Sequence, residues 1–141
     1  LGLSQSRRDA ERMGMQLNDI SGQVVDAALQ AHRALGPGLL ESVYEIVLAH
    51  ELRQRGLEVE RQMAVPIRYR DITFDEGFRA DLVVERRVLV ELKSVSELTD
   101  VHKKQVLTYL RLMDLRLGLL INFNVSLLKD GIVRIANDLR E

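Results

Sequence analysis

Residues 78–94 constrain the fold of this chain more than any other segment. Their sequence, FRADLVVERRVLVELKS, places two apolar runs on either side of a short charged turn at 85–87. A three-residue turn is typical of an antiparallel hairpin, and β-branched residues favour both runs as strands. The second run begins with Val88-Leu89-Val90, which does not alternate with polar residues and so indicates a strand covered on both faces of an α/β sheet. We therefore predict a mixed α/β fold built around this hairpin.

Apolar residues at helical spacing predict three helices, and extended patterns predict the strands between and after them. The sequence Gly36-Pro37-Gly38 separates the first two helices, because Pro disfavours a helical residue before it and Gly accepts positive φ. We expect helices over 19–35, from about 40 to Gly56, and over 100–113. The expected strands lie near 58–64, 66–70, 72–75, 78–84, 88–93 and 118–123, and a last hairpin is expected over 127–133.

The chain divides into a short leader and one unit. Residues 1–18 lack a sustained apolar stripe, and we interpret them as a flexible leader or an extended N-terminus before a natural start at Met13 or Met15. Residues 19–141 contain no repeat, low-complexity stretch or linker, so we expect a single domain there. A chain of this size buries roughly 65–70% of its surface on folding, which suffices for one core.

Composition excludes several classes of function. The chain has no cysteine, which excludes disulfides, thiolate metal sites and cysteine nucleophiles. Twenty Lys and Arg against 21 Asp and Glu give a net charge of -1, so a nucleic acid would have to be held by a local patch rather than by bulk charge. No apolar run approaches the 18 residues of a membrane span, and we expect a cytoplasmic protein without a membrane partner.

Three polar residues interrupt the apolar runs of the 78–94 hairpin. With a turn at 85–87, Val84 faces Val88, and the same register places Asp81 opposite Glu91. Like charges in that position are destabilising, so something must compensate, and Mg²⁺ or Mn²⁺ would do so because these cations prefer carboxylate oxygens. Strand alternation puts Lys93 on the same face as Glu91, where an ammonium group could orient a water or stabilise negative charge.

A structural interpretation of the same three residues stays open. Glu91 and Lys93 could form a same-face ion pair that contributes little, and Asp81 could lie at a solvated strand edge. The interruption of apolar strands, rather than polar ones, favours the metal site.

Several motifs make the chain resemble a known family. Gly38-Leu39-Leu40-Glu41-Ser42-Val43-Tyr44 fits a GxxExxY signature, and Arg79-Ala80-Asp81, Glu91-Leu92-Lys93 and the segment from Gln105 to Tyr109 follow in the expected order. The chain thus resembles the GxxExxY proteins, a bacterial and archaeal group placed in the PD-(D/E)XK nuclease superfamily. The resemblance extends from about Asp19 to Asn137 and includes the segments LNDISG, GLLINF and LLKDG.

The resemblance implies a fold and a set of functional residues. The implied fold is a restriction-endonuclease-like core, a mixed central sheet flanked by helices in the order αβββαβ. Asp81 and Glu91 would be metal ligands, joined by the backbone carbonyl of Leu92, and Lys93 would position the attacking water. Ala80 stands where the superfamily's name has Pro, a common variation that does not affect the ligand.

Three further residues are candidate catalytic residues only because of the resemblance. Glu41 matches an additional acidic residue near the metal, and Gln105 and Tyr109 match a QxxxY element on one face of the third helix. Without the resemblance, Glu41 is a carboxylate favoured by the helix dipole, and Gln105 with Tyr109 is the polar edge of an amphipathic helix. Tyr44 lies on the apolar stripe of the second helix and is expected in the core.

The resemblance implies Mg²⁺- or Mn²⁺-dependent hydrolysis of phosphodiester bonds in nucleic acid, DNA before RNA, with low sequence specificity. A noncatalytic nucleic-acid-binding or protein-interaction module that keeps the nuclease fold is the alternative, favoured by the small size and near-neutral charge. The intact set of Asp81, Glu91 and Lys93 argues against that alternative. A second copy of the chain or a separate protein stays open as a further partner.

Overall fold

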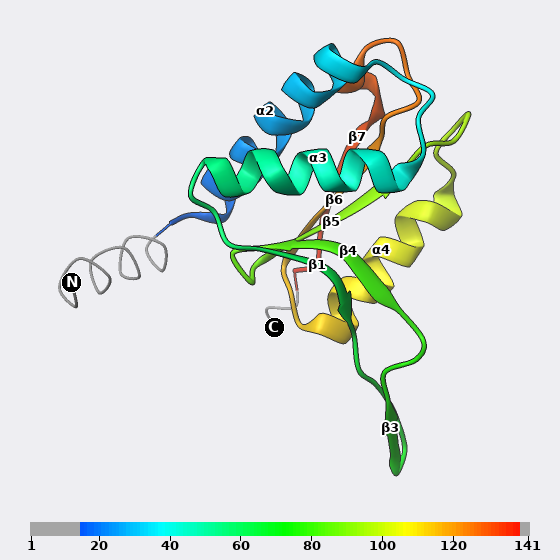
Figure 1. The fold of residues 1–141 in the computed structure, drawn as a ribbon. Coiled ribbons are helices and arrows are strands. Elements are labelled where there is room, and N and C mark those ends of the chain that lie inside the picture. Colours follow the sequence, from blue (N-terminus) through cyan, green and yellow to red (C-terminus); the bar gives the residue numbers. More distant parts are fainter. Residues whose placement is uncertain (1–14, 139–141) are drawn as a thin grey trace, which may run out of the picture.

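The computed structural model describes residues 15–138 (Figure 1). The elements, in order, are α2 (Leu17–Leu35), α3 (Glu41–Gln54), β1 (Val59–Ala64), β2 (Ile67–Tyr69), β3 (Ile72–Phe74), β4 (Arg79–Val84), β5 (Val88–Lys93), α4 (Asp100–Met113), β6 (Leu117–Asn122), the 3-10 helix η1 (Leu128–Gly131) and β7 (Ile132–Ala136). Apart from the last part of the chain, these elements confirm the predicted ones to within two residues at nearly every boundary.

A five-stranded mixed sheet forms the centre of the molecule, in the order β1-β4-β5-β6-β7. Only β5 and β6 are parallel, with Val88 opposite Leu117, and the crossover between them contains α4. The short strands β2 and β3 form a separate two-stranded hairpin that lies between β1 and β4 in the sequence. The element order and the mixed sheet confirm the predicted restriction-endonuclease-like α/β fold.

Helices cover both faces of this sheet (Figure 1). Residues of α2 and α3, such as Val24 and Leu48, share one buried cluster with Val90 and Leu92 of β5. On the other face, Val106 and Leu110 of α4 share a second cluster with Leu89. Because successive strand residues point to opposite faces, β5 is buried on both, as its unbroken apolar run predicted.

The hairpin predicted over 127–133 is wrong. Leu128 does not pair with Ile132 in a ladder: it is buried at 3% exposure and begins the 3-10 helix η1. The chain then enters β7, which pairs antiparallel with β6 from Ile121 opposite Ile132 to Leu117 opposite Ala136. Leu128 thus packs into the core instead of pairing with Ile132, and the turn-forming residues before Ile132 belong to the connection between the consecutive strands β6 and β7.

Within residues 15–138, none of the helices combines the length and the apolar character needed to cross a membrane.

The close approach of η1 to β6 makes a testable prediction. A Cβ atom added at Gly131 would collide with the backbone carbonyl oxygen of Asn122, which cannot move aside as a side chain could. We expect Gly131→Ala to lower the free energy of unfolding by about 2–3 kcal/mol, measured by urea denaturation. The matched control is Gly22→Ala in α2, where nothing lies within 4 Å and a gain of about 0.5–1 kcal/mol is expected. Equal effects of the two substitutions would contradict this account.

Candidate functional site

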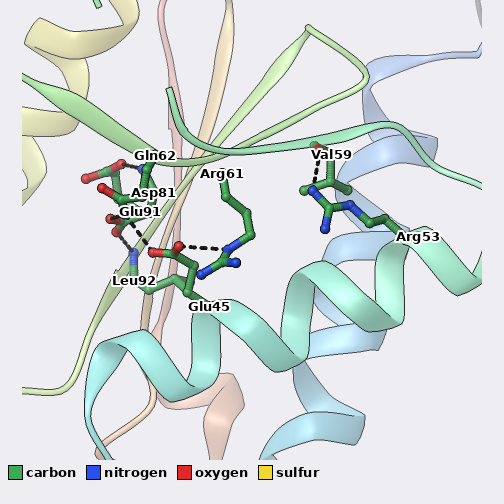
Figure 2. Close-up of polar contacts among 8 residues, drawn as sticks. All are labelled: Glu45, Arg53, Val59, Arg61, Gln62, Asp81, Glu91 and Leu92. Carbon is green, nitrogen blue, oxygen red and sulfur yellow. Dashed lines mark hydrogen bonds and ion pairs between the residues drawn. The ribbon is translucent and has the colours of Figure 1, made fainter. Parts of the chain in front are cut away.

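The candidate site lies where β4 and β5 part. Their ladder confirms the predicted register, with Val84 opposite Val88 and Leu82 opposite Val90. One step further, side chains replace the backbone ladder (Figure 2). The Asp81 N–H donates to Glu91 Oε2 at 2.9 Å, and the Leu92 N–H donates to Asp81 Oδ2 at 2.8 Å. The two carboxylates therefore face each other, each fixed by a backbone amide of the opposite strand.

Burial and mutual repulsion disfavour the ionised forms of both carboxylates. Glu91 is 6% exposed, and burial together with the charge of Asp81 raises its pKa to about 8, against a smaller opposing effect of Lys93. Burial also raises the pKa of Asp81, with a contribution from the charge of Glu45, while the hydrogen bond from Leu92 opposes the shift. Without a cation, the pair therefore carries less than two negative charges at neutral pH.

Two glutamates from α3 contribute to the same electrostatic environment. Glu41, the first residue of α3, is exposed, and its charge helps to raise the pKa of both Asp81 and Glu91. Glu45, one turn later, is 6% exposed and raises the pKa of Asp81 as well. Helix α3 thus contributes two acidic groups, four residues apart, whose charges act on the carboxylate pair.

Sequence analysis missed Glu45 and Gln62, which join β1 and α3 to this site (Figure 2). Gln62 Nε2 donates to Glu45 Oε1 at 2.7 Å and to Asp81 Oδ1 at 3.3 Å. Arg61 Nε pairs with Glu45 Oε2 at 3.0 Å, so the buried carboxylate has a cationic partner. The only sequence signal for Glu45 was its spacing from Glu41, and none pointed to Gln62.

The backbone at Gln62 is strained. Its φ is 53°, a left-handed conformation that is uncommon for a residue other than glycine. The side-chain amide of Gln62 lies between the carboxylates of Glu45 and Asp81. Its nitrogen donates to both, because a carboxylate can only accept hydrogen bonds from it. Strain of this kind persists only where the surroundings enforce it, and it is typical of functional sites.

Gln105 and Tyr109 lie on α4, which packs on the face of the sheet opposite α3. Tyr109 is half-buried and stacks on Phe78, the residue before β4. Burial and the charges of Glu91 and Asp81 raise its pKa, and a hydrogen bond from the exposed Gln105 side chain opposes that shift. The structure therefore places Gln105 and Tyr109 together and within the field of the carboxylate pair.

Tyr44 serves the turn between α2 and α3. Its side chain is fully buried and stacks on Phe123 with ring centroids 4.3 Å apart. Its hydroxyl donates to the Gly36 carbonyl at 2.6 Å and accepts from the Leu39 N–H at 3.1 Å. Gly38, at φ 94°, completes the turn. The expected core position of Tyr44 is confirmed, and the motif now has a physical basis: its glycine and tyrosine fix the point from which Glu41 begins α3.

Leu92 and Lys93 end the strand that carries Glu91. The Leu92 side chain is buried in the core, so only its backbone is available to the site. Lys93 is half-buried, and its charge acts on Glu91. The next residue, Ser94, donates from Oγ to the Leu39 carbonyl at 2.7 Å, which ties the end of β5 to the turn that precedes α3.

The donor chemistry of the site fits a hard divalent cation. Among residues 15–138, no group of three or more His, Cys, Asp and Glu side chains is arranged to hold a metal ion. Asp81 Oδ1 and Glu91 Oε1 nevertheless take no part in the two backbone hydrogen bonds that fix the pair. Carboxylate oxygens such as those of the half-buried Asp81 and the buried Glu91 are the donors that Mg²⁺ and Mn²⁺ prefer.

Comparison with protein families identifies the class. A model of the PD-(D/E)XK nuclease superfamily matches residues 18–135 of the 141, and the chain belongs to that superfamily. No curated protein and no solved structure matches the chain.

The raised pKa of Glu91 predicts a pH-dependent stability in the absence of metal. This carboxyl group titrates near 4.5 when unfolded and near 8 when folded, so between these values the folded state holds the extra proton. The free energy of unfolding therefore falls as pH rises from about 5 to about 8, by up to a few kcal/mol. We expect this fall for the wild type in urea denaturation with a chelator present, and a much smaller one for Glu91→Gln.

The matched control for Glu91→Gln is Glu97→Gln, a substitution at an exposed glutamate in the loop after β5. It is expected to keep the pH dependence of the wild type. A stability that stays constant over this pH range in the wild type, or that falls as steeply in Glu91→Gln, would show that Glu91 is not held in its protonated form.

Proposed function

We propose that this chain is an Mg²⁺- or Mn²⁺-dependent nuclease that hydrolyses phosphodiester bonds in nucleic acid, DNA in the first place, with low sequence specificity. The observation that supports this most strongly is the pair of half-buried Asp81 and buried Glu91, held face to face by backbone amides at the end of a ladder. Such a pair opposes folding unless it binds a cation or a proton. Superfamily membership supplies the reaction class.

The proposed ligands are Asp81 and Glu91, with the Leu92 carbonyl as a backbone ligand and Glu41 as an additional acidic group. A divalent cation, when bound, offsets negative charge on the phosphate and lowers the pKa of an attacking water. Lys93 follows Glu91 by two residues and would orient that water or stabilise charge that develops on the phosphate.

Gln105 and Tyr109 complete the proposed site from α4. The Tyr109 hydroxyl and the Gln105 amide are hydrogen-bond donors close to the carboxylates, and both could contact phosphate oxygens of the substrate. Because Tyr109 keeps its proton at neutral pH, it would act as a donor there and not as an anion.

We further propose that the chain belongs to the GxxExxY group of the superfamily and that residues 19–141 form one nuclease-like domain. The hydrogen bonds of Tyr44 to the turn at Gly36 and Leu39 support this assignment, because they give the spacing of the signature a structural role.

A noncatalytic module that keeps the fold is the second candidate. The carboxylates are already bonded to the Asp81 and Leu92 amides and to Gln62, and a protonated Glu91 would make the pair stable without a cation. This candidate predicts binding of nucleic acid or of a protein without metal-dependent cleavage.

Metal binding and cleavage distinguish the two candidates. We expect calorimetry to detect Mn²⁺ and Mg²⁺ binding by the wild type and not by Asp81→Asn, which keeps the shape of the side chain but removes its charge. Lys93→Gln should still bind metal while its cleavage of labelled single- and double-stranded DNA and RNA falls by a factor of about 10²–10⁴. This split would separate the ligand role from the positioning role.

The control for Asp81→Asn is Asp130→Asn, at an exposed position of η1 outside the proposed site. It should bind metal and cleave as the wild type does. Absence of metal binding in both the wild type and Asp81→Asn would reject the nuclease and favour the noncatalytic module. Metal binding that Asp81→Asn leaves unchanged would reject the ligand assignment.

A further inference from the structure

The hairpin β2–β3 projects from the body of the molecule (Figure 1). Its three cross-strand pairs run from Ile67 opposite Phe74 at the base to Tyr69 opposite Ile72 at the tip. Neither strand contributes a residue to the two buried clusters of the described chain. A two-stranded hairpin is marginally stable in water by itself. We therefore expect the role of this projecting hairpin to lie in binding rather than in packing of the core.

One face of this hairpin is apolar and open to solvent at its tip. Residues opposite each other in an antiparallel pair share a face, so Ile67, Tyr69, Ile72 and Phe74 lie together. Tyr69 is 58% exposed and Ile72 is 52% exposed. The two inner residues, Ile67 and Phe74, are half-buried and lie beside Gly77 at the base of the hairpin. The hairpin thus presents an aromatic ring and a β-branched side chain to solvent at its tip.

Arginine accompanies this aromatic ring. The guanidinium of Arg70 lies 5.2 Å from the centre of the Tyr69 ring, and Arg68 is exposed on the opposite face of the hairpin. Aromatic rings next to arginine are typical of surfaces that stack on bases and contact the adjacent backbone phosphates. Asp71 at the tip reduces the local positive charge, so stacking rather than bulk charge would dominate binding.

The hairpin is continuous with the candidate site. It leaves β1 after Ala64 and returns to β4 at Arg79, whose Nη1 donates to the Gln62 carbonyl at 3.2 Å. Gln62 in turn bonds to Asp81. Arg70 follows Gln62 by eight positions, so the tip of the hairpin lies at most about 25–30 Å from Gln62, which bonds to Asp81. A strand of several nucleotides would span this distance.

We propose that the β2–β3 hairpin binds unpaired nucleotides of the substrate, with Tyr69 stacking on a base, Arg70 contacting the phosphate next to it, and Arg79 contacting phosphates nearer the candidate site. The inference rests on the proposed function, because it takes a nucleic acid as the substrate. It adds a substrate class: a single strand, or a duplex with an unpaired end, since the ring of Tyr69 needs an open base face.

The absence of tryptophan from the sequence allows a direct test. Tyr69→Trp makes the tip of the hairpin the only tryptophan fluorophore, and stacking on a base is expected to quench its emission. The titrations use oligo-dT and oligo-U of about 20 nucleotides and a blunt duplex of the same length, all in a chelator to prevent cleavage. We expect saturable quenching by one or both single strands and little by the duplex.

Affinity measurements on two further variants test the role of the ring. Tyr69→Phe keeps the ring and should bind labelled oligo-dT within about twofold of the wild type. Tyr69→Leu keeps the face apolar but removes the ring, and it should bind about tenfold more weakly. Because the hairpin lies outside both buried clusters, the thermal midpoints of the variants should match that of the wild type.

Several outcomes would overturn the inference. They are quenching by the duplex equal to that by single strands, equal affinity of Tyr69→Leu and Tyr69→Phe, or an emission change that depends on protein concentration alone, which would make the tip a contact between two copies. Failure of the proposed function is distinguishable from these. A wild type without metal-dependent cleavage whose Tyr69→Trp variant is still quenched by single strands would reject the nuclease and support the hairpin as a binding element.

Discussion

The repulsion between Asp81 and Glu91 is the constraint on which the rest of the site depends. Two carboxylates meet where the β4–β5 ladder ends, and the Asp81 and Leu92 amides bond to them instead of continuing that ladder. Burial raises the pKa of both groups, and for Glu91 the hydrogen bond from the Asp81 amide and the charge of Lys93 do not offset the effect of burial and of the Asp81 charge. The strands on either side are held by apolar packing on both faces of the sheet, so they cannot move apart to relieve the repulsion. A proton or a cation must do so.

The surrounding elements are tied to this point by short polar contacts. Tyr44 and Ser94 both bond to the turn before α3, which fixes the start of that helix against the end of β5. Asn122, at 2% exposure, accepts from the Val95 N–H at 3.0 Å and donates to the Val95 carbonyl at 2.9 Å, and so holds the loop that leads to α4. Helices from opposite faces of the sheet thereby reach the same pair of carboxylates. Superfamily membership explains why a nuclease is the function to test first.

Local signals in the sequence predicted most of the fold and the centre of the candidate site. The turn at 85–87 fixes the register of its hairpin, and hence the meeting of Asp81 with Glu91, because turn length determines which residues face each other. Gln62 and Glu45 were not predictable in this way, since their contacts depend on the pairing of β1 with β4 and on the packing of α3. The strained φ of Gln62 has no sequence signal either. The last hairpin was wrong because a local turn signal was outweighed by the burial of Leu128 and by pairing of β7 with β6.

An NMR titration of the Glu91 side-chain carboxyl, with and without Mg²⁺, tests the central claim most directly. The account predicts a pKa of about 8 in the metal-free protein, caused by burial and by the charge of Asp81. It predicts that saturating Mg²⁺ lowers this pKa by several units, because a bound cation favours the ionised carboxylate. A metal-free pKa near the ordinary value of 4.5, or a raised pKa that Mg²⁺ leaves unchanged, would contradict the claim that this pair is built to hold a divalent cation.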